Sequence, residues 1–242
     1  MVKAKGSPTG SGFRWSGAAP QQILNIVNDP NKTDAQKNKQ LISYLKQEIP
    51  FSKVSGLSNY ETEALTEYVT ALTTLESKYG AVGLSTDPTL KATRANGYFA
   101  AVSSSPYNPA FRQGLLIGAQ MRSADNVYRL KKEQINRGHS MPCKMDRQTI
   151  LRYTVTHEYG HMLHNALASR SGANKRDFLM NAKRDIEHIA STKYGYSASK
   201  HLSTYGASKP AEFFAEAFAN AHLGAPNALG YAMQDYLAQQ GF

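Results

Sequence analysis

A stretch with helical periodicity carries the residues best suited to chemistry, His157, Glu158 and His161, in the spacing HExxH. Residues four apart lie on the same face of a helix, so His157 and His161 can bind one metal ion while Glu158 reaches over its edge. This motif is typical of zinc-dependent hydrolases. The alternative is a helix that carries two surface or core histidines, and residues further along the chain favour the metal site.

A catalytic zinc site needs another ligand, because such sites usually have three protein ligands and leave a fourth position for water. The metzincin pattern would place a histidine six residues beyond His161, but Leu167 occupies that position. His164 lies on nearly the same face as His157. One straight helix cannot easily wrap three consecutive turns around one ion, so we predict that His164 supports the site or the core instead of binding the metal.

Better candidates for the missing ligand lie in the run KPAEFFAEAF. Ser208 can cap a helix there, and Pro210 suits its first turn. Glu212 and Glu216 are then one turn apart on one face, which gives one carboxylate for the metal and another to hydrogen-bond a ligating histidine. The helix dipole favours a first-turn glutamate and would explain Glu212 without a metal, but it does not explain why both glutamates sit in so apolar a helix.

The sequence HEYGH followed by LSTYGASKPAEFFAEAF resembles the catalytic domain of anthrax lethal factor, which is a gluzincin metallopeptidase. It is also similar to zincin-like domains of phage minor head proteins and of bacterial polymorphic toxins. The upstream segment PFSKVSGLSNYETEALTEYVTALTTLESKYG resembles the phage group. The region between the motif and Glu212 does not match closely, so a toxin role and a phage-assembly role both stay open.

The resemblance implies a zinc-dependent endopeptidase whose zinc ligands are His157, His161 and Glu212. Glu158 would be the general base. Tyr205 would lie beside the metal, where it could donate a hydrogen bond to the developing oxyanion or assist the leaving group. Glu216 would orient a ligating histidine from behind.

The expected fold class is α+β. We expect a zincin-like metalloprotease fold with a small, mostly antiparallel sheet, an active-site helix and a helical C-terminal subdomain. Residues 1–20, rich in Gly, Ser and Pro, predict a flexible tail, and residues 21–242 a single metallopeptidase domain. Its expected parts are a helical region at 21–83, the sheet and active-site helix at 84–170, and the C-terminal subdomain at 171–242.

Short runs between turn residues, at Thr89–Ser103 and Gln113–Gly118, predict two or three antiparallel strands. The segment Ala95–Val102 could hold a peptide as an extra strand at the sheet edge, or it could form an ordinary hairpin. Periodicity and capping residues predict the helices. They are expected at Gln21–Asp29, from Thr33 or Asp34 to Pro50, from a Ser58–Glu61 capping box to Tyr79, at Ser123–Arg137 with Lys131 facing solvent, from Asp146 or Thr149 to Gly172, and at Asn174–Tyr194.

The chain of 242 residues contains one cysteine, which excludes an internal disulfide framework and suits a reducing compartment. Cys143 is either a lone thiol or a blocking metal ligand just ahead of the motif. No run approaches the roughly 18 apolar residues of a membrane span, and residues 1–20 lack the apolar core of a signal peptide. We therefore expect a cytoplasmic or virion-associated protein without a membrane span.

The formal net charge of +10 would attract nucleic acid or acidic partners, but the basic residues are dispersed, which favours a solvated surface. Three functional hypotheses follow. The first is an endopeptidase that acts on a protein or peptide substrate. The second is a phage virion or head-assembly protein in which the domain is structural or processes other virion proteins, and the third is a basic nucleic-acid-binding module.

Overall fold

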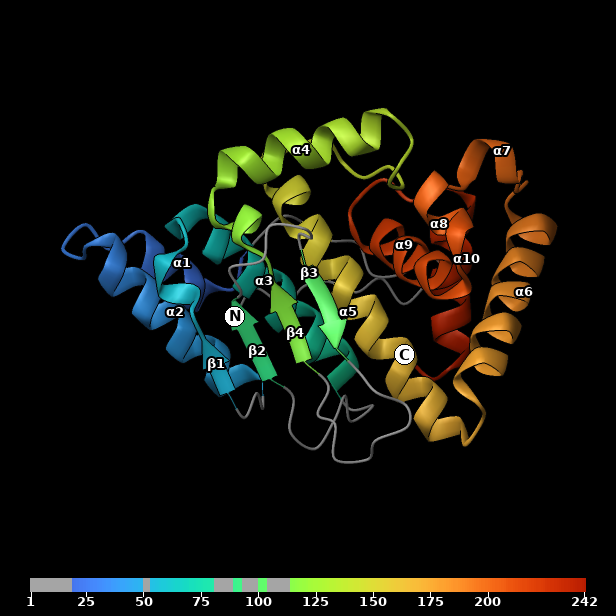
Figure 1. Cartoon of the computed structure of the whole chain (residues 1–242), viewed down its shortest axis with the longest axis horizontal. Helices are drawn as coiled ribbons and strands as arrows, with labels where there is room; N and C mark the ends of the chain where they lie inside the picture. Colours follow the sequence, from blue (N-terminus) through green and yellow to red (C-terminus); the bar gives the residue numbers. More distant parts are fainter. Residues whose placement is uncertain (1–18, 50–52, 81–88, 93–99, 104–113) are drawn as a thin grey trace.

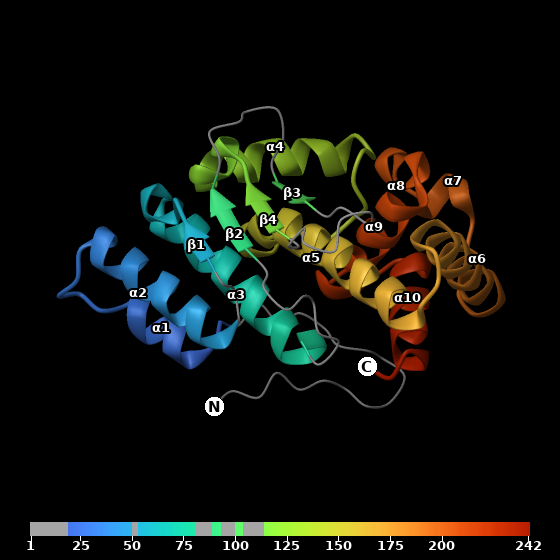
Figure 2. The same cartoon turned by 60° about the horizontal axis from the view of Figure 1, so that its bottom comes forward.

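Helices make up most of the described part of the chain in the computed structural model, which covers residues 19–49, 53–80, 89–92, 100–103 and 114–242. Figure 1 and Figure 2 show α1 and α2 at one end and α6 to α10 at the other, with α3, α5 and the sheet between them. The helices are α1 (Gln21–Val27), α2 (Asp34–Glu48), α3 (Thr62–Tyr79), α4 (Ala124–Asn136), α5 (Arg147–Ser171), α6 (Lys175–Lys193), α7 (Ala198–His201), α8 (Thr204–Ser208), α9 (Pro210–His222) and α10 (Ala228–Gln239).

The sheet has four short strands in the order β1-β2-β4-β3. These are β1 (Lys53–Ser55), β2 (Thr89–Ala92), β4 (Gly114–Ile117) and β3 (Ala100–Ser103). The first two pairings, β1 with β2 and β2 with β4, are parallel, and only β3 with β4 is antiparallel. Helix α3 lies between β1 and β2 in the chain, as a parallel crossover requires.

The prediction of an α+β fold with a small, mostly antiparallel sheet is therefore wrong. The strands are three or four residues long, helices predominate, and most of the strand pairings are parallel. Of the two or three antiparallel strands predicted between Thr89 and Gly118, β3 and β4 do pair antiparallel, whereas β2 pairs with β4 in parallel. The expected substrate segment Ala95–Val102 lies outside the described residues except at its end, Ala100–Val102, which belongs to β3.

A side-chain cap marks the start of α2 but not that of α3. The Thr33 hydroxyl accepts from the Gln36 amide and the Gln36 side chain accepts from the Thr33 amide, so the predicted start of α2 is confirmed. The predicted Ser58 cap of α3 is wrong, because Ser58 lies in a 3-10 turn and the N-cap is Glu61. The Glu61 carboxylate instead accepts from the Ala124 amide at 2.8 Å and so joins α3 to α4.

The active-site helix α5 is buried on nearly all sides and packs against α3, α4, α6, α9 and β3. Asp146 caps its start by accepting from the Thr149 amide, and Gly172 ends it at φ 66°, a left-handed conformation that glycine adopts without strain. A buried ion pair between Arg152 and Glu67 joins α5 to α3. Both predicted boundaries of the helix are confirmed.

The remaining helices, α6 to α10, form the other end of the molecule (Figure 1). The predicted helix over Asn174–Tyr194 is confirmed as α6, with Asn174 as its N-cap. The predicted Ser208 cap of α9 is wrong, because Ser208 ends α8 and the N-cap of α9 is Lys209. Among the described residues, no helix is both long enough and apolar enough to cross a bilayer.

Candidate metal centre

Two neighbouring helices bring His157, His161 and Glu212 together, the histidines from α5 and the glutamate from the first turn of α9. The Nε2 atoms of His157 and His161 each lie 3.2 Å from Oε2 of Glu212, and the three potential ligand atoms lie within 4.8 Å of one another. Ligands 2.0–2.1 Å from a tetrahedral zinc ion are about 3.3 Å apart. The donor set and its spacing therefore fit a metal ion, and this group could hold one.

A glycine lets α9 approach α5 closely enough to deliver Glu212. A Cβ atom on Gly160 would lie 3.1 Å from Cα of Ala215 and 3.2 Å from Cβ and Cδ1 of Phe218. Gly160 is therefore a point of close contact between α5 and α9. The close approach places the first turn of α9 opposite the two histidines.

The buried carboxylate of Glu216 lies behind His157. Its Oε1 is 3.1 Å from Nδ1 of His157. Its Oε2 accepts from the Met141 amide at 2.6 Å, the Tyr153 hydroxyl at 3.1 Å and the Ser203 hydroxyl at 3.0 Å. Such a carboxylate fixes the orientation of an imidazole ligand and raises its basicity. The carboxylate itself is fixed by groups from three other segments.

The carboxylates control the protonation of His157. Burial would raise the pKa of both glutamates, but contacts with His157 hold the pKa of Glu216 below its usual value, and contacts with His157 and His161 hold that of Glu212 far below. Burial alone would lower the pKa of His157, whereas Glu212 and Glu216 raise it to about 9. In the metal-free protein at neutral pH, His157 therefore carries a proton that a metal ion must displace.

The structure places His164 directly behind His161. Nε2 of His164 lies 3.0 Å from Nδ1 of His161, the ring nitrogen that faces away from Glu212. Burial, together with the charge of His161, lowers the pKa of His164 well below its usual value, so its ring stays neutral. His164 does not belong to the group of residues that could hold the metal.

Glu158 and Tyr205 both lie near His157. Glu158 is buried beside His157 on α5. Tyr205 on α8 is half exposed, and its ring centroid is 5.9 Å from that of His157. Burial and then the charges of Glu212, Glu158 and Glu216 raise the pKa of Tyr205, so its hydroxyl keeps its proton and can donate a hydrogen bond.

The loop between α4 and α5 positions α8, which the sequence did not reveal. The Thr204 amide donates to the Gly138 carbonyl at 2.9 Å, and the Tyr205 amide donates to the His139 carbonyl at 3.2 Å. Gly138 has φ +70°, a conformation that other residues rarely adopt. Backbone groups of this loop thus determine the position of Tyr205. A sequence motif made of side chains cannot predict such backbone hydrogen bonds.

Lys131 on α4 is buried, so the prediction that it faces solvent is wrong. Its Nζ lies 4.8 Å from the centroid of the Tyr153 ring and 3.5 Å from the Ser140 hydroxyl. Its charge helps to hold the pKa of Glu216 low. A signal was present in the sequence, because Ala124, Val127 and Lys131 recur at the spacing of one buried helix face.

Cys143 is buried in a small apolar cluster and is not part of the candidate metal group. Its cluster partners are Ile150, Tyr153, Ala219 and Leu223. Burial raises the pKa of the Cys143 thiol to about 12, so it stays protonated at neutral pH. The structure therefore places this thiol in the core, where the reading as a blocking ligand finds no support.

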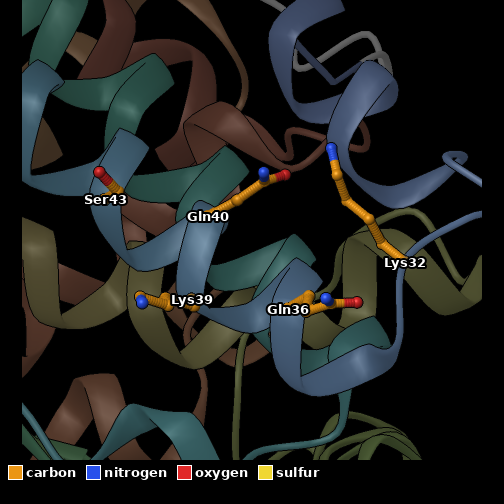
Figure 3. A pocket seen from close by; sticks show the side chains of 5 residues that line it. All are labelled: Lys32, Gln36, Lys39, Gln40 and Ser43. Carbon is orange, nitrogen blue, oxygen red and sulfur yellow. The ribbon is translucent and has the colours of Figure 1, made fainter.

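A polar groove on α2 lies at the other end of the molecule from α9 (Figures 1 and 3). Its lining residues are Lys32, Gln36, Lys39, Gln40 and Ser43. Lys32 is paired with Asp29 at 2.8 Å. The groove holds no acidic, histidine or cysteine side chain, so it is unrelated to the metal centre.

Comparisons with known proteins add no evidence about the site. No protein-family model matches this chain, and none of the curated proteins or solved structures matches it. The resemblance to gluzincin domains and the assignment of residue roles therefore stay predictions.

Proposed function

We propose that the chain is a zinc-dependent endopeptidase that hydrolyses peptide bonds with Glu158 as general base. The observation that carries the proposal is the convergence of His157, His161 and Glu212, whose potential ligand atoms lie within 4.8 Å of one another. Bound zinc lowers the pKa of a coordinated water toward neutrality and polarises a carbonyl. Glu158 lies next to a ligating histidine in sequence, as the general base of an HExxH hydrolase does.

The side chains around the centre then have distinct roles. Glu158 accepts the proton of the attacking water and delivers it to the leaving amine. Tyr205 keeps its proton and donates a hydrogen bond to the developing oxyanion or to the leaving group. Glu216 holds the ring of His157 in place through its Nδ1 contact.

The position of strand β3 in the sheet is consistent with a peptide substrate. It is at the end of the strand order β1-β2-β4-β3, and within the described residues it pairs with β4 alone. It also packs against α5, the helix of the metal-binding histidines. An extended peptide added to this edge would lie next to β3, which contacts the helix of His157 and His161, and strand hydrogen bonds would hold its backbone.

Cleavage of a peptide library by the full chain tests the proposal, with products identified by mass spectrometry. We expect the zinc-loaded wild type to cut internal bonds, and Glu158→Gln to keep its zinc but lose about 10²–10⁴-fold in rate. Glu133→Gln removes a surface carboxylate that pairs only with Arg137 among the described residues, and should cleave like the wild type. A wild type without zinc, or equal cleavage by the wild type and Glu158→Gln, would refute the proposal.

A further inference from the structure

His164 and His161 form a buried pair of imidazoles on α5. Nδ1 of His161 and Nε2 of His164 are 3.0 Å apart, and the two rings meet edge to face at 88°. His164 is 1% exposed, and its ring also meets that of Phe214 edge to face. The ring of His164 is therefore held in one orientation, with Nε2 directed at His161.

A metal ion bound to His161 would determine which ring nitrogen of each histidine in this pair carries a hydrogen. If Nε2 of His161 binds the metal, the ring hydrogen of neutral His161 must lie on Nδ1. That Nδ1–H then donates to the lone pair on Nε2 of His164. The hydrogen of His164 must consequently lie on its own Nδ1.

Nδ1 of His164 is buried, and within the described part of the chain no group accepts a hydrogen bond from it. A buried donor without an acceptor costs free energy, because it has given up its hydrogen bond to water. A phenylalanine or leucine at this position would avoid that cost. Among the described residues, the contact with His161 is the polar contact that gives a reason for a histidine here.

We propose that His164 is a positioning residue that fixes the tautomer and the ring orientation of the metal ligand His161. This inference rests on the proposed zinc site. The two ligating histidines are then held differently, because a charged carboxylate lies behind His157 and a neutral imidazole lies behind His161. A neutral acceptor orients its ligand without adding negative charge to the site, so the metal keeps more of its power to polarise a carbonyl.

The test measures the zinc dissociation constant of the full chain by competition with a chelator, and the thermal unfolding midpoint of the metal-free protein. We expect His164→Phe to raise the dissociation constant about 10- to 100-fold. The midpoint of metal-free His164→Phe should equal or exceed that of the wild type. His164→Gln, whose side-chain oxygen can accept from His161, should bind zinc more tightly than His164→Phe.

A matched control is His188→Gln, which changes an exposed histidine on α6 and should leave both measurements unchanged. Unchanged zinc affinity in His164→Phe would overturn the inference. So would a His164→Phe protein that fails to fold or unfolds at a lower temperature without metal, because the residue would then act through the fold. Side-chain ¹⁵N NMR of the zinc-bound wild type should show the hydrogen of His161 on Nδ1.

The outcomes separate this inference from the proposed function. A wild type that binds no zinc would refute the proposed function, and the inference would fail with it. A wild type that binds zinc and cleaves peptides, beside a His164→Phe variant with equal affinity, would refute the inference alone.

Discussion

Replacing Gly160 by alanine tests whether the contact between α5 and α9 sets the geometry of the metal centre. Alanine favours a helix over glycine by about 1 kcal/mol, so propensity alone predicts a more stable protein. The new Cβ would lie 3.1 Å from Cα of Ala215 and 3.2 Å from two atoms of Phe218. Because one of these atoms is backbone, α9 must move by a few tenths of an ångström, and such overpacking costs roughly 1–3 kcal/mol. We expect a net loss of about 1 kcal/mol.

We expect Gly160→Ala to weaken zinc binding more than it lowers the stability of the fold. In the metal-free protein α9 can shift and relieve only part of the strain, which leaves the loss of stability given above. When Glu212 reaches the ion, α9 must return and the relieved part of the strain reappears. Strain of roughly 1–3 kcal/mol then appears as a zinc dissociation constant about 5- to 150-fold higher.

The assays for Gly160→Ala are urea unfolding of the metal-free protein and chelator competition for zinc. Ser169→Ala is the control for helix propensity, because Ser169 is an exposed residue of the same helix, and it should leave zinc affinity unchanged. A Gly160→Ala protein that is more stable than the wild type and binds zinc equally well would refute the reasoning.

Three further changes test other contacts. Glu216→Gln removes the charge behind His157 and should weaken zinc binding about 10- to 100-fold, as measured by chelator competition; unchanged affinity would remove Glu216 from the site. Glu67→Ala removes the carboxylate that pairs with the buried Arg152 and should lower the free energy of unfolding by about 3–5 kcal/mol in urea; a loss below about 1 kcal/mol would contradict this. Burial lowers the pKa of His222 from its ordinary 6.5 to about 3, so between these values the unfolded chain binds one more proton than the folded protein. Stability should fall as the pH drops through this window, by up to about 1.4 kcal/mol per pH unit from this group, and a His222→Gln variant with an equally steep loss would contradict the assignment.

Local spacing predicted the two members of the metal group that lie on one helix. His157 and His161 share a face because a helix repeats every 3.6 residues, and nothing else in the fold is needed for that. Glu212 comes from another helix, and only its apolar surroundings and the family resemblance indicated it. The amides and carbonyls of the 138–141 loop carry no sequence signal, because every residue has the same backbone groups.

The sheet shows where sequence patterns fail. Turn residues predicted antiparallel strands after residue 88, which holds for β3 with β4, but β2 pairs with β4 in parallel. Strands of three or four residues show too little alternation to specify a partner or a direction. The helices were predicted better because they are longer, and their ends at Thr33, Asp146 and Gly172 depend on local capping. The misplaced starts at Ser58 and Ser208 depend on tertiary contacts and on a neighbouring short helix.

The position of the metal ion tests the central claim most directly. A crystal structure of the zinc-loaded full chain, with anomalous scattering measured at the zinc absorption edge, would locate it. We predict one zinc ion within about 2.0–2.2 Å of Nε2 of His157, Nε2 of His161 and a carboxylate oxygen of Glu212. An ion that lacks any of these three ligands, or a protein that takes up no zinc at saturating concentration, would contradict the account.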